Sequence, residues 1–192
     1  MLFPLFPGCR LPASEAQRTT GSIQIRRLQP GDVDAICEAV LESRAALSPW
    51  VPWCHPGYSR EDTATWVAGR SGAWDRDEEK GFVIVDATAR LLGCCGIHHI
   101  DAANGVAELG YWVRSRATGR GVATEATRLL TRWAFREALL HRIEMLISAE
   151  NVASQRVAEK SGAVREGILR DRMLLHGRRH DAVLFSLLNT QI

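Results

Sequence analysis

The segment Glu108-Leu-Gly-Tyr-Trp-Val113, which continues as Arg-Ser-Arg-Ala-Thr-Gly-Arg-Gly-Val-Ala-Thr-Glu-Ala (114–126), decides the fold. Its first part predicts a strand, and its second part predicts a turn that leads into a long amphipathic helix. Gly119 and Gly121 can adopt strained backbone dihedrals and let a ligand approach the main chain closely. Because unpaired N–H groups and the positive end of the helix dipole meet at a helix start, we expect this turn to favour a diphosphate.

Three arginines surround the same turn and would add charge-assisted donors to a bound phosphate: Arg114, Arg116 and Arg120. A Rossmann fingerprint is disfavoured, because Thr124 stands at the position of its third glycine and the strand ends a run of three strands instead of opening a βαβ unit. A P-loop is excluded, since no Gly-Lys-Ser/Thr follows. Considered alone, the turn also fits a glycine-rich helix start that binds nothing.

The rest of the chain alternates strand-like and helix-like segments, which predicts a mixed α/β sheet with antiparallel hairpins and crossover helices. Asn104–Gly105 is a strong hairpin signal, and Ser59 with Asp62 is a weak capping box. In chain order, the expected segments are a strand at 22–28, a helix with Val33, Ile36, Val40 and Leu41 on one face, a Pro/Trp-rich loop (47–58), a helix to about Trp74, strands at 81–86, 90–100 and 106–114, a helix from about Gly121 to Leu140, a strand at 142–148, a helix at about 152–161, and two closing strands separated by His176–Gly177.

Size and composition indicate one globular domain. The chain has 192 residues, of which 46% are hydrophobic and 24% charged, and its 24 Lys and Arg nearly balance 22 Asp and Glu. The resulting net charge of +2 argues against nucleic-acid binding as the main task. Residues 1–21 hold three prolines and show no periodicity, so we expect a flexible N-terminal extension there and the domain at 22–192.

The cysteines and the apolar runs bear on the compartment. The five cysteines are odd in number and never spaced as CxxC, which argues against a disulfide framework or a structural zinc site and fits a reducing cytoplasm. Cys94 and Cys95 lie in an apolar stretch and are expected to be small buried side chains. Since the sequence has no run of 18 apolar residues, it predicts no membrane span.

Several motifs resemble those of one family. The pattern Arg116-x-x-Gly119-x-Gly121, after a strand and before a long helix, resembles the coenzyme A motif of the GNAT superfamily of N-acetyltransferases. The segment NVASQRVAEKSG (151–162) resembles the second motif of its ribosomal-protein (RimJ/RimL-type) branch, where Asn-x-x-Ser-x-Arg-x-x-Glu-Lys-x-Gly recurs. The resemblance covers about residues 22–188, because LSPWVPW (47–53), AELGYWV (107–113) and LRDRMLLHGRRHDAVLFSLL (169–188) also look like that branch.

This resemblance implies a fold of about seven strands with a splayed central pair and four helices. The splayed strands would be 108–114 and 142–148, and the pantetheine arm of acetyl-CoA would enter the gap between them. Asn151 would bond the arm, although Asn is also a favoured N-cap. The resemblance assigns the remaining coenzyme contacts to Trp112, Val113 and Arg114, whose backbone would also polarise the acetyl carbonyl, and to the turn residues Arg116, Gly119, Arg120, Gly121, Val122 and Ala123.

The resemblance also implies roles in the chemistry. Glu108 is the first candidate for the base that deprotonates the amine, the alternative being an edge carboxylate paired with a nearby Arg. Ala158 stands where many relatives carry a tyrosine acid, so Ser154 is the candidate that would hydrogen-bond the coenzyme sulfur, unless it is only a small residue in a helix start. A carboxylate considered for the base on the penultimate strand of the branch matches Met173, which leaves only Asp171 as a substitute there.

The acceptor site would border the loop that carries Trp50 and Trp53, which either form a wall for the substrate or fix the loop to its own domain. His98 and His99 are adjacent on a strand and should point to opposite faces, so we expect no metal site.

The expected function is acetyl-CoA-dependent acetylation of a primary amine by direct transfer in a ternary complex. The acceptor is expected to be the α-amino group of a peptide or protein N-terminus. Alternatives are a small-molecule amine as the acceptor and a longer acyl donor such as succinyl-CoA. A third alternative is a non-catalytic coenzyme A-binding regulatory module, because Ala158 and Met173 stand where relatives carry catalytic side chains. The sequence predicts no metal, nucleic-acid or membrane partner and leaves a homodimer open.

Overall fold

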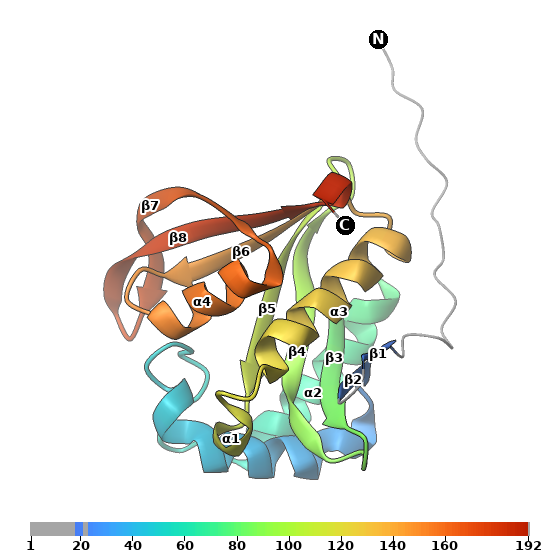
Figure 1. Cartoon of the computed structure of the whole chain (residues 1–192). Helices are drawn as coiled ribbons and strands as arrows, with labels where there is room; N and C mark the ends of the chain where they lie inside the picture. The colour runs from blue at the N-terminus through green and yellow to red at the C-terminus, as the bar shows by residue number, and fades with distance from the viewer. Residues whose placement is uncertain (1–17, 21–22, 192) are drawn as a thin grey trace.

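One mixed sheet runs through the part of the chain that the computed structural model describes, residues 18–20 and 23–191 (Figure 1). Its eight strands lie in the order β1-β2-β3-β4-β5-β6-β8-β7. All neighbours are antiparallel except β5 and β6, which are parallel. The strands are β1 (Arg18–Thr20), β2 (Ile23–Arg27), β3 (Lys80–Asp86), β4 (Leu91–Asp101), β5 (Val106–Val113), β6 (Arg142–Ser148), β7 (Val164–Leu175) and β8 (Arg178–Leu188).

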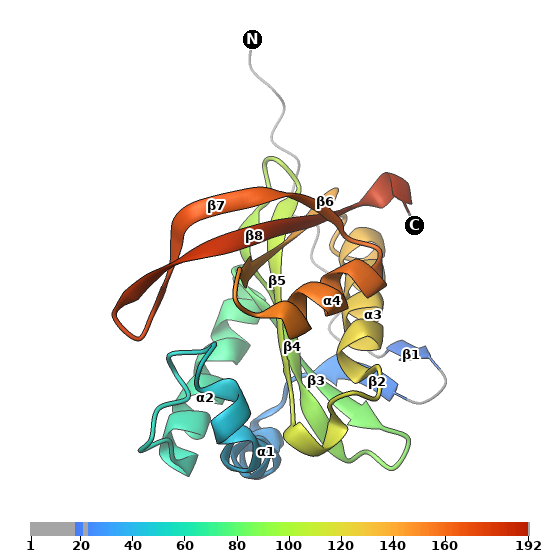
Figure 2. The ribbon, with the colours of Figure 1, turned by 60° about the vertical axis from the view of Figure 1, so that its left-hand side comes forward.

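Four helices cover the two faces of this sheet: α1 (Val33–Leu47), α2 (Arg60–Asp75), α3 (Val122–Arg136) and α4 (Val152–Ser161). Helices α1 and α2 lie on one face of β3–β5, and α3 and α4 lie on the other (Figure 2). Successive side chains of β3 point to opposite faces of the sheet. Phe82 and Ile84 pack in the core under α3, and Val83 and Val85 pack in the core under α1 and α2. The sheet is therefore buried on both faces at its centre.

The predicted fold class and the four helices are confirmed, with one additional strand. Residues 18–20 form β1 and pair with β2, so the expectation of a loose extension through residue 21 is wrong for these three residues, while 1–17 and 21 lie outside the described residues. Helix α3 ends at Arg136, before the expected Leu140, and Leu139 then adopts a φ of +52°. Leu41 is 45% exposed and does not share the buried face of α1.

Two local predictions are confirmed by their hydrogen bonds and dihedrals. Ser59 caps α2, and the Ser59 and Asp62 side chains each accept a bond from the other residue's backbone N–H. Gly105 adopts a φ of +63° in the β4–β5 hairpin. No helix within the described ranges is long and apolar enough to cross a membrane.

The parallel pair β5 and β6 separates soon after it forms. It is paired only at Val106↔Arg142, Ala107↔Ile143 and Glu108↔Glu144, whereas β6 continues to pair with β8 along its whole length to Ser148. Figure 1 shows the two strands diverging, with β7 and β8 turning away together with β6. The predicted splay of the central strands is thereby confirmed.

Candidate active site

The gap between β5 and β6 exposes main-chain groups that a sheet normally pairs. Within the described sheet, residues 109–113 of β5 and 145–148 of β6 have no strand partner on the edges that face each other. Backbone N–H and C=O groups at such an edge need hydrogen-bonding partners. An extended ligand with amide groups fits this edge, because it can take the place of the missing strand.

The turn at the end of β5 delivers the start of α3 to the mouth of the gap. Gly119 and Gly121 have φ values of +73° and +79°, and a Cβ at either position would meet nothing within 4 Å. Gly121 is the N-cap of α3, has no side-chain cap, and receives the first helical bond from Glu125 N–H. The N–H groups of 122–124 therefore have no acceptor within the helix, and they leave an open site for an anion.

The arginines around this turn are only partly free to meet that anion. The Arg114 guanidinium is buried and donates to Leu91 O at 3.0 Å and to Glu38 Oε1 at 2.7 Å, as well as to Glu42. The expected phosphate-binding role of the Arg114 side chain is therefore wrong, because α1 supplies the carboxylates that occupy it. The Arg114 backbone N–H is also engaged, since it donates to Leu92 O at 2.8 Å.

The other two arginines remain at the surface. The half-exposed Arg116 side chain also pairs with Glu42, and the guanidinium groups of Arg116 and Arg114 hold the pKa of Glu42 well below its usual range. Arg120 is exposed between the two glycines. Ser115 N–H donates to the buried Ser43 Oγ at 2.8 Å. Helix α1 therefore holds the turn in place through Ser43, and its Glu42 pairs with the arginines of the turn.

The start of α4 borders the other side of the gap. Asn151 Oδ1 accepts a hydrogen bond from Ser154 N–H at 3.0 Å, which confirms the N-cap interpretation of this residue. Ser154 Oγ in turn accepts a hydrogen bond from the Tyr111 hydroxyl of β5 at 3.1 Å. Burial raises the pKa of Tyr111, so this hydroxyl keeps its proton. Tyr111 was not among the expected site residues, although strand alternation from Trp112 places it on the α4 side.

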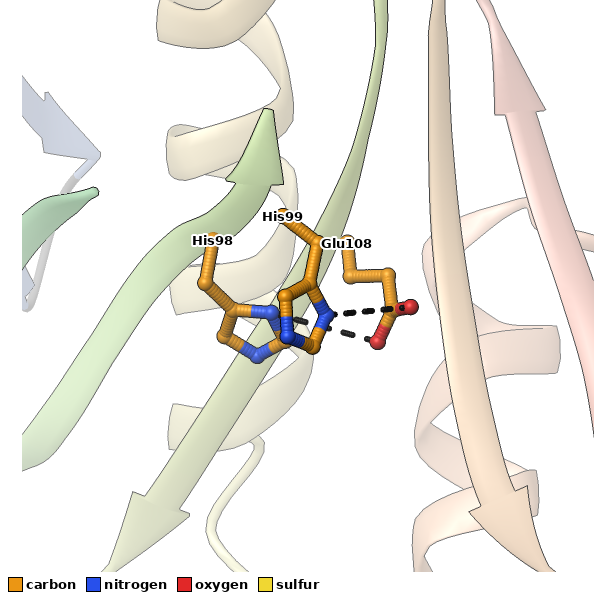
Figure 3. Close-up of side chains that lie close together, drawn as sticks. All are labelled: His98, His99 and Glu108. Atoms are coloured by element: carbon orange, nitrogen blue, oxygen red, sulfur yellow. Dashed lines mark ion pairs between the residues drawn. The ribbon is translucent and has the colours of Figure 1, made fainter. Parts of the chain in front are cut away.

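On the face of the sheet that carries α1 and α2, Glu108 meets both adjacent histidines of β4 (Figure 3). Its carboxylate lies 3.9 Å from His98 Nδ1 and 3.2 Å from His99 Nδ1. A β-bulge between His98 and Asp101 causes this convergence, with His99 at a φ of +50°. The expectation that the two imidazoles point to opposite faces is therefore wrong, since it assumed an unbroken strand.

Chemically, this cluster can accept protons or hold a cation. Burial lowers the pKa of His98, against an opposing effect of Glu108, so the imidazole stays neutral. One ligand atom from each of the three side chains lies within 4.8 Å of the others, which is a candidate metal-binding arrangement within the described residues. Arg172 of β7 also approaches Glu108 Oε1, at 4.0 Å.

The penultimate strand contributes this arginine and no carboxylate to the cluster. A bulge between Leu169 and Met173 shifts the register of β7, and Asp171 within it has a φ of +51°. The Asp171 side chain is exposed, and its N–H donates to Asp181 Oδ1 at 3.0 Å. The bulge thus directs Arg172 toward Glu108.

A cavity of about 710 Å³ opens beside Glu108, between β3–β5 and the helices α1 and α2. Its lining includes Trp53, His98 and residues 110–112 of β5, but it does not include Trp50. Trp53 packs at tilted angles against Tyr58 and Trp112, with ring centroids 5.8 Å and 6.4 Å away. Of the two tryptophans expected at an acceptor site, Trp53 is the one that lines this cavity.

Comparisons with known proteins agree with this geometry. A family model described as an acetyltransferase (GNAT) domain matches residues 22–164. The Bacillus subtilis protein YdaF, whose name assigns it to the ribosomal N-acetyltransferases, is 30% identical over 174 residues, covering 88% of this chain and 92% of YdaF. The Escherichia coli ribosomal-protein-serine acetyltransferase is 24% identical over 173 residues, covering 90% and 96% of the two chains.

Solved structures give the same result. Mycobacterium smegmatis RimJ, in complex with a CoA disulfide, superposes with a TM-score of 0.80 at 26% identity and covers 88% of this chain and 83% of its own. RimL, a ribosomal L7/L12 α-N-protein acetyltransferase in complex with coenzyme A, shares the fold with a TM-score of 0.82 at 23% identity, over 88% of this chain and 95% of RimL. The chain therefore belongs to the GNAT family of N-acetyltransferases, with RimJ- and RimL-like relatives.

Proposed function

We propose that this N-acetyltransferase transfers the acetyl group of acetyl-CoA directly to a primary amine, foremost the α-amino group of a peptide or protein N-terminus. The observation that carries the proposal is the gap between β5 and β6. It has an uncapped helix start at its mouth, Glu108 on one side and the Tyr111–Ser154 pair on the other.

The residues around the gap fit a coenzyme A thioester. The open edges at 109–113 and 145–148 match the two amides of a pantetheine arm. The N–H groups of Val122 and Ala123 would hold the diphosphate, with Gly119 and Gly121 giving close access and Arg116 and Arg120 at the rim. Main-chain groups of Trp112 and Val113 would polarise the thioester carbonyl. When bound, the thioester supplies the activated acetyl group.

Glu108 is the proposed base. A primary amine arrives as an ammonium ion and must lose a proton before it can attack a carbonyl carbon. The Glu108 carboxylate takes that proton directly or through water, while His98 and His99 stand beside it as further acceptors. The alternative expected for Glu108 is a carboxylate paired with an arginine. Arg172 approaches the Glu108 carboxylate at 4.0 Å, which is farther than His99 Nδ1 at 3.2 Å.

Ser154 is the proposed acid for the leaving sulfur. Since Ser154 Oγ accepts the Tyr111 proton in its hydrogen bond, its own hydroxyl hydrogen is free to point into the gap. Donation of that proton to the sulfur, as the carbon–sulfur bond breaks, yields a neutral thiol. Ala158 of α4 is fully buried and has no proton to donate. The Tyr111 hydroxyl of β5, which is hydrogen-bonded to Ser154 Oγ, would instead replace the proton that Ser154 gives to the sulfur.

The names of the relatives support an N-terminal acceptor. RimL is described as an α-N-protein acetyltransferase, and the E. coli relative as a ribosomal-protein-serine acetyltransferase. The geometry equally admits a small-molecule amine, because the cavity beside Glu108 is deep enough for one. The open edges that hold the arm set no limit on the length of the acyl group.

A thiol-release assay tests the proposal. The purified chain is incubated with acetyl-CoA and a panel of N-terminal peptides and free amines, and each acetylated product is identified by mass spectrometry. We expect release of coenzyme A that depends on the amine and is lost in Glu108→Gln. Binding of acetyl-CoA without transfer to any amine in the panel would instead identify a coenzyme A-binding regulatory module.

A further inference from the structure

The floor of the cavity beside Glu108 is a row of three glycines on three adjacent strands. Gly81 of β3 pairs with Gly96 of β4, and Gly96 pairs with Gly110 of β5. All three line the cavity. Neighbouring strands lie about 4.8 Å apart, so the row spans roughly 10 Å of bare main chain. Glycine within a strand marks a place where a ligand can approach the backbone closely.

Local packing accounts for two of these glycines but not for the third. A Cβ at Gly96 would lie 3.0 Å from Lys80 O, and one at Gly110 would lie 3.1 Å from His98 Nε2. A Cβ at Gly81 would meet only ordinary contacts, with Leu28 Cβ at 3.9 Å and Arg70 Cδ at 4.0 Å. A side chain at the β3 end of the row would therefore pack beside Leu28 and Arg70 without a forced clash, so packing alone does not require glycine there.

The walls over this strip are apolar and largely aromatic. Trp66 of α2, Trp53 and Tyr58 of the preceding loop, and Trp112 of β5 surround it, together with Ile36 and Val40 of α1. The charged lining residues already have partners among the described residues. Arg70 pairs with Glu79, Lys80 with Asp77, and Asp62 accepts the Ser59 N–H at 2.8 Å. The cavity thus offers a planar apolar group more than it offers a charged one.

The direction of the row connects this cavity to the reaction. The row ends at Gly110 of β5. One edge of β5 pairs with β4, and its opposite edge faces the gap. Glu108 stands two residues from Gly110 on the same face of β5. The His98 ring lies over Gly110, between the row and the carboxylate. A group lying on the row toward β3 would therefore leave an attached amine at β5, next to the His98 imidazole, whose Nδ1 lies 3.9 Å from the Glu108 carboxylate.

We infer that the acceptor is a primary amine carrying a planar aromatic group, which lies on the glycine row under Trp66 and Trp53. The inference rests on the proposed function for its reaction and adds the substrate class. A methyl or hydroxymethyl side chain would leave these apolar walls in contact with water, whereas an aromatic ring removes them from it. A free arylalkylamine and a peptide with an N-terminal aromatic residue share this chemistry.

Kinetics with matched acceptors test the inference. The pairs are phenethylamine against n-butylamine and Phe-Ala-Ala against Ala-Ala-Ala, with Ala-Phe-Ala to detect a ring at the second residue. We expect kcat/KM to favour the aromatic member of at least one pair by about tenfold or more. The pair that shows the preference identifies the source of the amine. Equal or better use of n-butylamine and Ala-Ala-Ala, or a preference confined to Ala-Phe-Ala, would overturn the inference.

A variant that fills the row gives the second measurement. Gly81→Val adds methyl groups at the β3 end of the row, where a Cβ meets only ordinary contacts, and Gly167→Val on β7, where a Cβ meets nothing within 4 Å, is the matched control. We expect Gly81→Val to lower kcat/KM for the aromatic acceptor about tenfold and for its aliphatic partner less than about threefold. Gly167→Val should leave both unchanged. Equal losses for both acceptors in Gly81→Val would contradict the inference.

Binding separates the inference from the proposed function. Binding of phenethylamine, followed by quenching of the tryptophans that line the cavity, should be about tenfold weaker in Gly81→Val than in the wild type. If no amine is acetylated but this difference in binding is found, the transferase proposal fails and the aromatic site stands. If amines are acetylated but phenethylamine binds the two proteins equally, the aromatic site fails alone.

Discussion

The Tyr111 hydroxyl donates a hydrogen bond to Ser154 Oγ at 3.1 Å and so joins β5 to α4 across the gap between β5 and β6. The two residues are 43 positions apart in the sequence. A hydroxyl group thus reaches the gap from the strand, whereas Ala158 of α4 is buried and carries no hydroxyl.

Removing either hydroxyl should slow the release of the coenzyme thiol. Ser154→Ala should lower kcat about 100-fold, and Tyr111→Phe by a smaller factor of about tenfold, because the second acts through the first. The double variant should be no slower than Ser154→Ala alone. Stopped-flow measurement of thiol release checks this, with Ser161→Ala on the same helix as a control. Additive losses would show that the two hydroxyls act separately.

Glu108→Gln should lower kcat about 100-fold at neutral pH, since the amide cannot take the ammonium proton. The deficit should shrink as pH is raised toward 9, because more of the amine is then neutral without help. Glu144→Gln is the matched control, since Glu144 lies opposite Glu108 in the register of β5 and β6 and pairs with Arg142. A deficit that stays constant with pH would assign Glu108 a role in positioning the acceptor.

Added zinc should inhibit the enzyme by occupying Glu108 and both imidazoles. The three ligand atoms already lie within 4.8 Å of one another, so little rearrangement is needed. Inhibition should be relieved by EDTA, and His99→Ala should weaken zinc binding at least tenfold in calorimetry. His141→Ala, which removes an exposed histidine elsewhere, should have no effect. Unchanged zinc affinity in His99→Ala would place the metal at another site.

Arg114→Met should destabilise the fold by about 2–4 kcal/mol. The substitution leaves the half-buried Glu42 without one cation and Leu91 O without its donor. Urea denaturation should show the loss as a lower midpoint with an unchanged slope. Arg136→Met, at an exposed position of α3, should stay within about 0.5 kcal/mol of the wild type. A mild effect at Arg114 would mean that the carboxylates hydrate freely.

The pair of Arg142 and Glu166 should make stability depend on acid pH. Hydrogen bonds from Arg142 and then Ser186 lower the pKa of Glu166 from 4.5 to about 2. A lowered folded-state pKa contributes stability that is complete above about pH 4.5 and is lost as pH falls toward 2. The unfolding midpoint of Glu166→Gln should therefore lie below that of the wild type at pH 6 and approach it near pH 2. Parallel curves over this range would contradict the assignment.

The sequence predicted those parts of the fold that local rules determine. The bounds of β6 and α4 match the expected segments, because turn residues and an Asn cap punctuate them. The capping box of α2 and the hairpin at Gly105 depend on residues within one turn of each other. The glycines before α3 were expected to take unusual dihedrals for the same reason, and both have positive φ.

Contacts between distant segments could not be read in this way. Arg114 looked like a phosphate ligand until α1 placed Glu38 and Glu42 against it. The convergence of His98 and His99 depends on one extra residue in β4, which breaks the period of two on which the expectation relied. Periodicity gives the face of a side chain only while the strand stays regular.

The three residue pairs that join β5 to β6 leave the sheet as two plates on a short hinge. Strands β1–β5 carry Glu108 and the glycine row. Strands β6, β8 and β7 form the second plate, which carries Arg172 on β7, and Ser154 belongs to α4, the helix that connects β6 to β7. A donor lying in the gap would bond both plates and act as a strut that sets their angle. The amine site, which draws groups from both plates, is then complete only after the strut is in place, so we expect the donor to bind first and the acceptor second.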